Sequence, residues 1–240
     1  MTSMVSGATS QGMLNTDDSF DFAQIEDMDP SLTNGYRLLY DREVPVEIRS
    51  VRVLGEKTNS GVLESIKVKM LVLGSDDAPQ SIRIELSSEA DLFFVFVHVI
   101  DEDVYAGVQN QQKLMVDFLD YPNVLIRMLN ACIREPHVHL AIFTMVGAGH
   151  EGTLEFIQNM EYKFVELMSC AFDRASEEVV QHQITYRYNA VKSRLALMQA
   201  QLLELNNLVK TKNPSLLLQL QQHHKPAGNA ATVASSFSRR

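Results

Sequence analysis

The start of the predicted folded region alternates between apolar and polar residues with a period of two. The pattern runs through YRLLYDREVPVEIRSVRVL, LESIKVKMLVL and SIRIELSS. Because successive side chains of a strand point to opposite faces, this pattern predicts antiparallel strands with one buried face. GSDDAPQ predicts the turn between the last two strands, and Pro45 indicates an edge strand or a strand start in the first. The predicted inward positions are Ile66, Val68, Met70, Ile82, Ile84 and Leu86.

The rest of the predicted head domain, residues 35–175, adds further strands and a helical insert. A buried strand is predicted for DLFFVFVHVI, and a helical turn for DEDVYAGVQNQQ. The clearest short helix is YPNVLIRMLNACIREP, with Val124, Met128 and Ile133 on or near one face. A last β hairpin is predicted from HLAIFTMVG and the stretch 154–172, which flank GAGHEGT. The fold class is therefore expected to be α+β.

From Ser176 the pattern becomes helical. Ser176 is expected to cap the helix, and Glu177 and Glu178 complement its dipole. Apolar residues then recur at alternating spacings of four and three over the helix 176–212, which is typical of a coiled coil. A helix that docks on its own domain has a wider stripe, so the pattern favours a two-stranded dimer. The predicted seam consists of Ile184, Tyr188, Val191, Leu195, Met198, Leu202, Leu205 and Val209.

Composition and charge narrow the classes of function. The chain has 240 residues, 45% of them hydrophobic, and a net charge of −9, which disfavours nucleic acid and anionic membranes as partners. Residues 1–34 are rich in acids and predict a disordered arm, in which DDSFDFAQIEDMD is a possible docking motif; a disordered tail is expected at 213–240. No signal peptide or membrane span is indicated, so we expect a cytoplasmic or cytoskeletal protein.

Candidate catalytic and metal-binding residues are few. GAGHEG matches GxGxxG, but a dinucleotide-binding fold needs this motif early and further βα units after it, so a hairpin tip is the preferred interpretation. His137 and His139 have metal-like spacing without a third ligand, and Cys132 and Cys170 form no CxxC pair. We therefore expect no enzyme activity, no cofactor, no metal and no small-molecule substrate.

A long central block carries a family resemblance. Residues 89–132, EADLFFVFVHVIDEDVYAGVQNQQKLMVDFLDYPNVLIRMLNAC, resemble the head domain of the spindle assembly abnormal protein six family, the self-assembling protein of the centriolar cartwheel. LYDREVPVEI at 39–48 fits the first strand of that family, and FIQNMEYKFVEL at 156–167 fits its last hairpin strand. The resemblance covers roughly residues 36–210. It implies a β-sandwich or barrel-like head with a helical insert, followed by a short parallel coiled coil.

The resemblance also implies a contact between heads. In the family, a large hydrophobe near the tip of the last hairpin inserts into an apolar pocket of a neighbouring head. By position this residue falls at or next to Thr153, so Leu154 is the first candidate and Phe156 the second; the alternative is that Leu154 packs within its own head. The candidates for the pocket are Leu125, Met128 and Leu129.

The implied function is that of a non-catalytic, self-assembling structural protein of the centriole, basal body or a related microtubule-based structure. It would form homodimers and higher homo-oligomers, with other centriolar, basal-body or apical cytoskeletal proteins as partners. The chain holds about four heptads, so it resembles the short six-like paralogue, which is associated with basal bodies, flagella and the apical complex. The alternatives are a dimeric scaffold of the DNA-end-joining type and a simple adaptor with the same fold.

Overall fold

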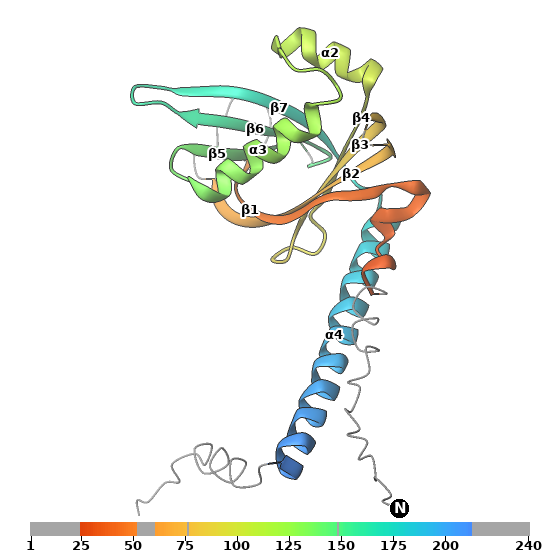
Figure 1. The fold of residues 1–240 in the computed structure, drawn as a ribbon. Coiled ribbons are helices and arrows are strands. Elements are labelled where there is room, and N and C mark those ends of the chain that lie inside the picture. Colours follow the sequence, from red (N-terminus) through yellow and green to blue (C-terminus); the bar gives the residue numbers. More distant parts are fainter. Residues whose placement is uncertain (1–24, 52–60, 76, 148, 213–240) are drawn as a thin grey trace, which may run out of the picture. The chain divides into compact units, whose positions relative to one another are not determined.

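The computed structural model describes residues 25–51, 61–75, 77–147 and 149–212. They fall into two units, one at Ala23–Asn189 and one that contains 190–212. In chain order the labelled elements are η1 (Pro30–Gly35), β1 (Arg37–Val51), β2 (Val62–Ser75), β3 (Ala78–Ser88), β4 (Val95–Asp101), α2 (Glu102–Gln112), α3 (Tyr121–Arg134), β5 (His139–Val146), β6 (Glu151–Asn159), β7 (Phe164–Arg174) and α4 (Glu177–Lys212) (Figure 1). We call the unit Ala23–Asn189 the head unit.

The strands of the head unit close into a barrel with the order β1-β2-β3-β4-β7-β6-β5 (Figure 1). Neighbouring strands are antiparallel except β1 and β5, whose parallel pairing closes the barrel. β1 pairs with β2 from Arg37 to Ile48, and its parallel pairing with β5 starts only at Val46. Pro45, which has no N–H to donate, lies just before that start, in accordance with its predicted edge-like position. The predicted barrel-like α+β head is confirmed.

The core consists of the inward side chains of the strands together with buried side chains of α2 and α3. All six predicted inward positions of β2 and β3 are buried, which confirms the two-residue alternation. Aromatic rings fill the interior of the barrel: Phe143 makes edge-on contacts with Phe94, Phe96 and Phe172, with ring centroids 4.9 to 5.9 Å apart. Gly152 lies beneath the Phe143 ring, and a Cβ atom there would come within 2.3 Å of it. A glycine at this position of β6 is therefore required by the packing.

The buried face of α3 differs from the predicted one. Val124, Met128 and Ile133 are only partly buried, whereas Leu125 and Leu129 are almost completely buried. The helix packs on β1 and β5, and its buried stripe follows 125, 129 and 132, each one position away from a predicted residue. Spacings of four and three residues keep these side chains on one face. Burial of Cys132 raises the pKa of its thiol to about 11, which keeps it protonated at neutral pH.

Other elements of the structure differ in length or number from those predicted. α2 has three turns instead of one, because the Asp101 carboxylate caps it by accepting a hydrogen bond from the Val104 amide (2.9 Å). The predicted last hairpin is a three-stranded meander, β5-β6-β7. Two glycines of GAGHEG, Gly147 and Gly149, have positive φ angles between the end of β5 and the start of β6, so the predicted hairpin tip is confirmed. A second turn, around 160–163, interrupts the stretch that was expected to form one strand.

Residues 25–34, which were predicted to belong to the disordered acidic arm, are part of the structured head unit. Residues 25–27 form a helical turn, and η1 begins after Asp29, whose carboxylate accepts a hydrogen bond from the Ser31 amide (2.9 Å). Ser31 is buried against the head. The hydrogen-bond partners of Ser31 lie on β2, β3 and α4, far away in the sequence. The local sequence therefore could not indicate that this segment is ordered. The remaining arm, including the possible docking motif up to residue 24, and the predicted tail 213–240 lie outside the described residues.

Candidate functional site

The heptad positions of α4 form an exposed apolar face. The helix begins at Glu177, and the Ser176 hydroxyl accepts a hydrogen bond from the Val179 amide (3.4 Å), as the predicted cap requires. Ile184 and Val209 are half-buried. The other six predicted seam positions are exposed, and they are Tyr188, Val191, Leu195, Met198, Leu202 and Leu205. A row of large apolar side chains on a solvated helix is the surface that a second helix covers in a coiled coil.

The first turns of α4 are attached to the head by buried polar side chains. Gln183 donates a hydrogen bond to the Ser31 hydroxyl (2.9 Å), and Ser31 in turn donates to the Glu85 carboxylate (2.6 Å). Arg187 donates to the Ser88 carbonyl (2.8 Å). These bonds join η1, β3 and α4 within the head unit. The direction in which the helix starts is therefore set by the head and not by the helix alone.

A buried ion pair supports the same junction. Lys69 of β2 is paired with Asp29, and both side chains are about nine-tenths buried. Burial alone would raise the pKa of Asp29, but the hydrogen bond and charge of Lys69, together with the Ser31 amide, outweigh it and hold that pKa below its usual value. The Lys69 ammonium also lies 5.7 Å from the ring centroid of Tyr186 on α4. Sequence reasoning missed this junction because its members lie up to 152 positions apart.

The structure corrects the predicted head-pairing residues. Leu154 and Phe156 are each 2% exposed and belong to the barrel core, so neither is available to insert into another head. Thr153 is half-buried on the opposite face of β6. Among the pocket candidates, Leu125 and Leu129 are core residues, and Met128 is partly buried against the core. The cause is the two-residue alternation of β6, which directs its even-numbered side chains inward.

One group of exposed hydrophobes lies at the next turn, between β6 and β7. Tyr162 is 90% exposed and Phe164 is 65% exposed, and Met160 beside them is also exposed. The Met160 amide donates to the Lys163 carbonyl (2.8 Å), which closes the turn tightly. A tight turn holds these side chains away from the barrel. The polar residues of QNMEYK could have indicated this turn from the sequence.

A cavity lies where the barrel opens between β4 and β7. These strands pair only at Phe96 with Arg174 and at Val97 with Asp173. Beyond this point α2 bridges the gap: the Gln112 side chain donates to the Ser169 carbonyl (2.7 Å) and accepts from its amide (2.9 Å). The cavity, of about 410 Å³, has a mixed lining: Val97 and Val99 of β4 and Val104 and Val108 of α2 are apolar, whereas Gln111, Gln112, Ser169 and Asp173 are polar or charged.

His98 lies in the wall of this cavity. Its Nδ1 donates to the Ala171 carbonyl (2.7 Å), and within the described part of the chain its buried Nε2 has no hydrogen-bond partner. Burial lowers the pKa of His98, against the opposing effects of that carbonyl and of Asp173. The imidazole is therefore neutral, and it closes the seam between β4 and β7 as a structural side chain.

Within the described ranges, no three His, Cys, Asp or Glu side chains are grouped so that they could hold a metal ion, and His137 and His139 gain no third ligand there. No helix among the described residues is both long and apolar enough to cross a membrane. Cys132 and Cys170 are both free and buried.

Comparison with known families and curated proteins identifies relatives. The family model of the centriolar protein SAS N-terminal domain matches residues 38–172. The spindle assembly abnormal protein 6 homolog of Gallus gallus is 30% identical over 108 residues, which cover 45% of this chain and 16% of that protein. The homolog of Danio rerio is 26% identical over 98 residues, or 41% of this chain and 15% of that protein. The chain thus matches less than a fifth of the length of these relatives.

Solved structures share the fold. An N-terminal fragment of Leishmania SAS-6 that contains part of its coiled coil domain has a TM-score of 0.61 and 18% identity, and the match covers 72% of this chain and 98% of the fragment. A fragment of Drosophila melanogaster Sas-6, dimerised via the coiled-coil domain, has a TM-score of 0.60 and 15% identity, with 82% and 98% covered. The N-terminal coiled-coil dimer of C. elegans SAS-6 has a TM-score of 0.54 and 14% identity, with 73% and 99% covered.

Proposed function

Because the chain belongs to the family of the centriolar protein SAS N-terminal domain, we propose that it is a non-catalytic structural protein that self-assembles at the centriole or basal body. The observation that carries the proposal is the exposed heptad face on a helix that begins in a closed barrel head. Such a chain has an apolar surface that only another helix of matching period covers well. Its first partner is therefore a second copy of itself.

Dimerisation through α4 is the first interface. Complete burial of one Leu, Val or Met side chain contributes roughly 1.5–3 kcal/mol. Six exposed seam positions are enough to offset the cost of association, although about four heptads make a modest coiled coil. The Drosophila and C. elegans fragments, which share this fold, are dimers through their coiled coils. We extend that arrangement to this chain.

Head pairing is the second interface, with a revised inserting residue. Tyr162 at the β6–β7 turn replaces Leu154 as the candidate, because it is the most exposed aromatic side chain of the described residues. The cavity between α2, β4 and β7 replaces the α3 residues as the candidate pocket. Its valine walls suit the ring of a tyrosine, and the amide of Gln111 at its lining is a partner for the hydroxyl group.

Two different interfaces on one chain produce extended assemblies. A dimer through α4 presents two heads, and each head contact adds a further dimer. Whether the product is a closed ring or an open filament depends on the rotation between the two interfaces. Weak contacts are sufficient, because each additional contact is made within an assembly that is already linked.

Sedimentation velocity over a wide concentration range tests the two interfaces together. We expect the full chain to form species larger than a dimer, and Tyr162→Glu to stop at the dimer, since its charge would be buried against valine side chains and close to the Asp173 carboxylate. Met115→Glu is the matched control, because Met115 is fully exposed on the loop between α2 and α3, away from the turn. If Tyr162→Glu assembles like the wild type, the proposed tip contact is wrong. If the wild type stops at a dimer, the chain is a dimeric adaptor with this fold.

The cellular site requires a separate measurement. A fluorescent fusion of the full chain should co-localise with centriole or basal-body markers. Accumulation only at the flagellum base or the apical complex would reassign the structure to which the protein contributes. A diffuse cytoplasmic signal would contradict the proposed location.

A further inference from the structure

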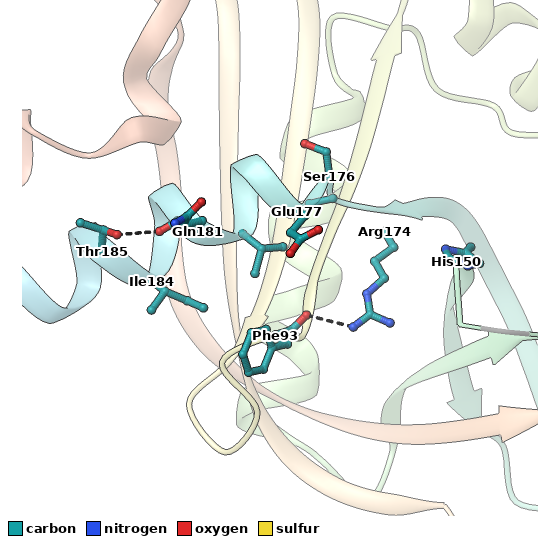
Figure 2. A pocket seen from close by; sticks show the side chains of 10 residues that line it. Phe93, His150, Arg174, Ser176, Glu177, Gln181, Ile184 and Thr185 are labelled. Atoms are coloured by element: carbon teal, nitrogen blue, oxygen red, sulfur yellow. Dashed lines mark hydrogen bonds between the residues drawn. The ribbon is translucent and has the colours of Figure 1, made fainter.

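A groove of about 730 Å³ lies within the head unit where α4 begins (Figure 2). One wall is the first two turns of α4, and the other is formed by Phe93, His150 and Arg174. The Phe93 ring is 64% exposed, which is unusual for a phenylalanine next to a barrel core. Arg174 donates a hydrogen bond to the Phe93 carbonyl (3.4 Å), so an apolar ring and a cation are held together on the head side of the groove (Figure 2).

The seam of α4 runs into this groove. Counting back from Tyr188 with the alternating spacings of four and three residues gives Ile184, Gln181 and Glu177. All three line the groove. The face of the helix that a coiled-coil partner covers is therefore the same face that opens toward Phe93 and Arg174.

We propose that the first turns of α4 from a second copy of the chain lie in this groove, so that each helix start contacts both the helix and the head of its partner. The inference rests on the coiled-coil dimer of the proposed function and names the additional surface that the dimer uses. In a parallel dimer with aligned heptads, the second helix has its own residues 177–184 at the height of the groove.

The chemistry of the two surfaces is complementary. Glu177 and Gln181 are polar seam positions, and a glutamate that faces its copy across a dimer is repulsive. Helix-to-helix contact alone is therefore weak at this end. Glu177 and Glu178 of an incoming helix would meet the Arg174 guanidinium, and apolar side chains of its first turns would cover the Phe93 ring. The head therefore provides the opposite charge and the apolar surface that the polar start of the seam does not provide.

Photo-crosslinking from position 93 tests this contact in the full chain. Phe93 is replaced by p-benzoyl-L-phenylalanine, which preserves an aromatic side chain, and equal amounts of unlabelled and ¹⁵N-labelled chains are allowed to exchange subunits. After irradiation, trypsin releases residues 84–113 and 175–187 as separate peptides. We expect a crosslink between these two peptides in which about half of the products combine a light and a heavy peptide, as random pairing requires.

Two controls distinguish the possible failures. A Leu195→Cys variant, mixed in the same way, should form a light-to-heavy disulfide across the seam, which reports the coiled-coil dimer and the exchange of subunits. Replacement of Phe164 by the same photo-crosslinker gives an equally exposed aromatic outside the groove, and it should not react with 175–187.

The two crosslinks together show whether the groove contact or the coiled-coil dimer is wrong. If the Leu195→Cys disulfide forms but position 93 does not crosslink to 175–187, or does so only within light or within heavy chains, the groove contact is wrong and the dimer remains. If the Leu195→Cys disulfide also fails, the proposed coiled-coil dimer is wrong, and the groove contact with it.

A binding measurement provides an independent test. Phe93→Ser should raise the dimer dissociation constant by about tenfold, since part of a phenylalanine ring no longer becomes buried on association. Leu92→Ser is the matched control, because Leu92 is exposed next to Phe93 without lining the groove. Equal dissociation constants for Phe93→Ser and the wild type by sedimentation equilibrium would overturn the proposal.

Discussion

β6 and α4 both carry apolar side chains at regular spacing, but only β6 buries them within the chain. Leu154 and Phe156 point into the barrel, where β5 and β7 lie on either side of their strand. Leu195 and Leu202 recur just as regularly and remain exposed. A strand stripe is covered once a sheet closes on itself, whereas a narrow heptad stripe fits another helix of the same period. Regular apolar spacing therefore indicates burial, and its period indicates whether the burial is within one chain or between chains.

The largest expected effect comes from a cavity in the barrel. Phe156→Ala should lower the free energy of unfolding by about 3–5 kcal/mol, because a fully buried ring is removed from a close-packed core. Urea unfolding followed by circular dichroism measures the change. Tyr162→Ala, at the exposed turn only six positions later, should stay within about 0.5 kcal/mol of the wild type. Equal effects at the two positions would contradict the assignment of Phe156 to the core and Tyr162 to the surface.

The next effect is on association and not on folding. A double variant with Leu195→Asp and Leu202→Asp should raise the dimer dissociation constant at least about 100-fold, since two charges would have to be buried in the seam. Sedimentation equilibrium gives the constant. The same substitutions at Ala200 and Asn207, which lie on the side of the helix opposite the seam, serve as the control. A large loss of barrel stability in the seam variant would mean that this face of α4 is covered within its own chain.

A smaller effect on stability is expected at the buried ion pair where η1 and β2 meet the start of α4. Lys69→Met leaves the Asp29 carboxylate buried without its partner and should lower the free energy of unfolding by about 2–3 kcal/mol. Adding Asp29→Asn should recover most of this loss, because the uncompensated charge is removed. Chemical denaturation of both variants measures the difference. If the double variant is as unstable as Lys69→Met, the cost comes from packing and not from the unpaired charge.

The smallest effect depends on pH. The folded pKa of His98 is lowered, so the unfolded chain takes up a proton first, near pH 6.5, and stability is lost as pH falls below that value. Above about pH 6.5 the histidine is neutral in both states and causes no pH dependence. His98→Gln retains a donor for the Ala171 carbonyl and should flatten the decline between pH 7.5 and pH 5.5 in urea midpoints, relative to the wild type. Identical pH profiles for the two proteins would contradict the buried, neutral state of His98.

The strands and helices of the head were largely predictable because their burial follows local periods. The alternation of Ile66, Val68 and Met70 required only the sequence, and so did the cap and heptads of α4. The face of α3 was predicted one position off, since most of its residues are apolar and several stripes fit. The candidates Leu154 and Phe156 proved to be core residues, because the family resemblance placed them by position along the chain and did not show which face of β6 they occupy.

The sequence by itself determined the period of each segment, and with it the division between a strand-rich head and a heptad helix. Only the tertiary structure decided the closure of the barrel by parallel β1 and β5, the junction of Asp29, Lys69, Ser31 and Gln183, and the groove beside Phe93. The physical reason is the distance along the sequence over which each feature is formed. Periodicity reflects neighbours within a few residues, whereas these features join residues dozens of positions apart, whose proximity exists only after the barrel has closed.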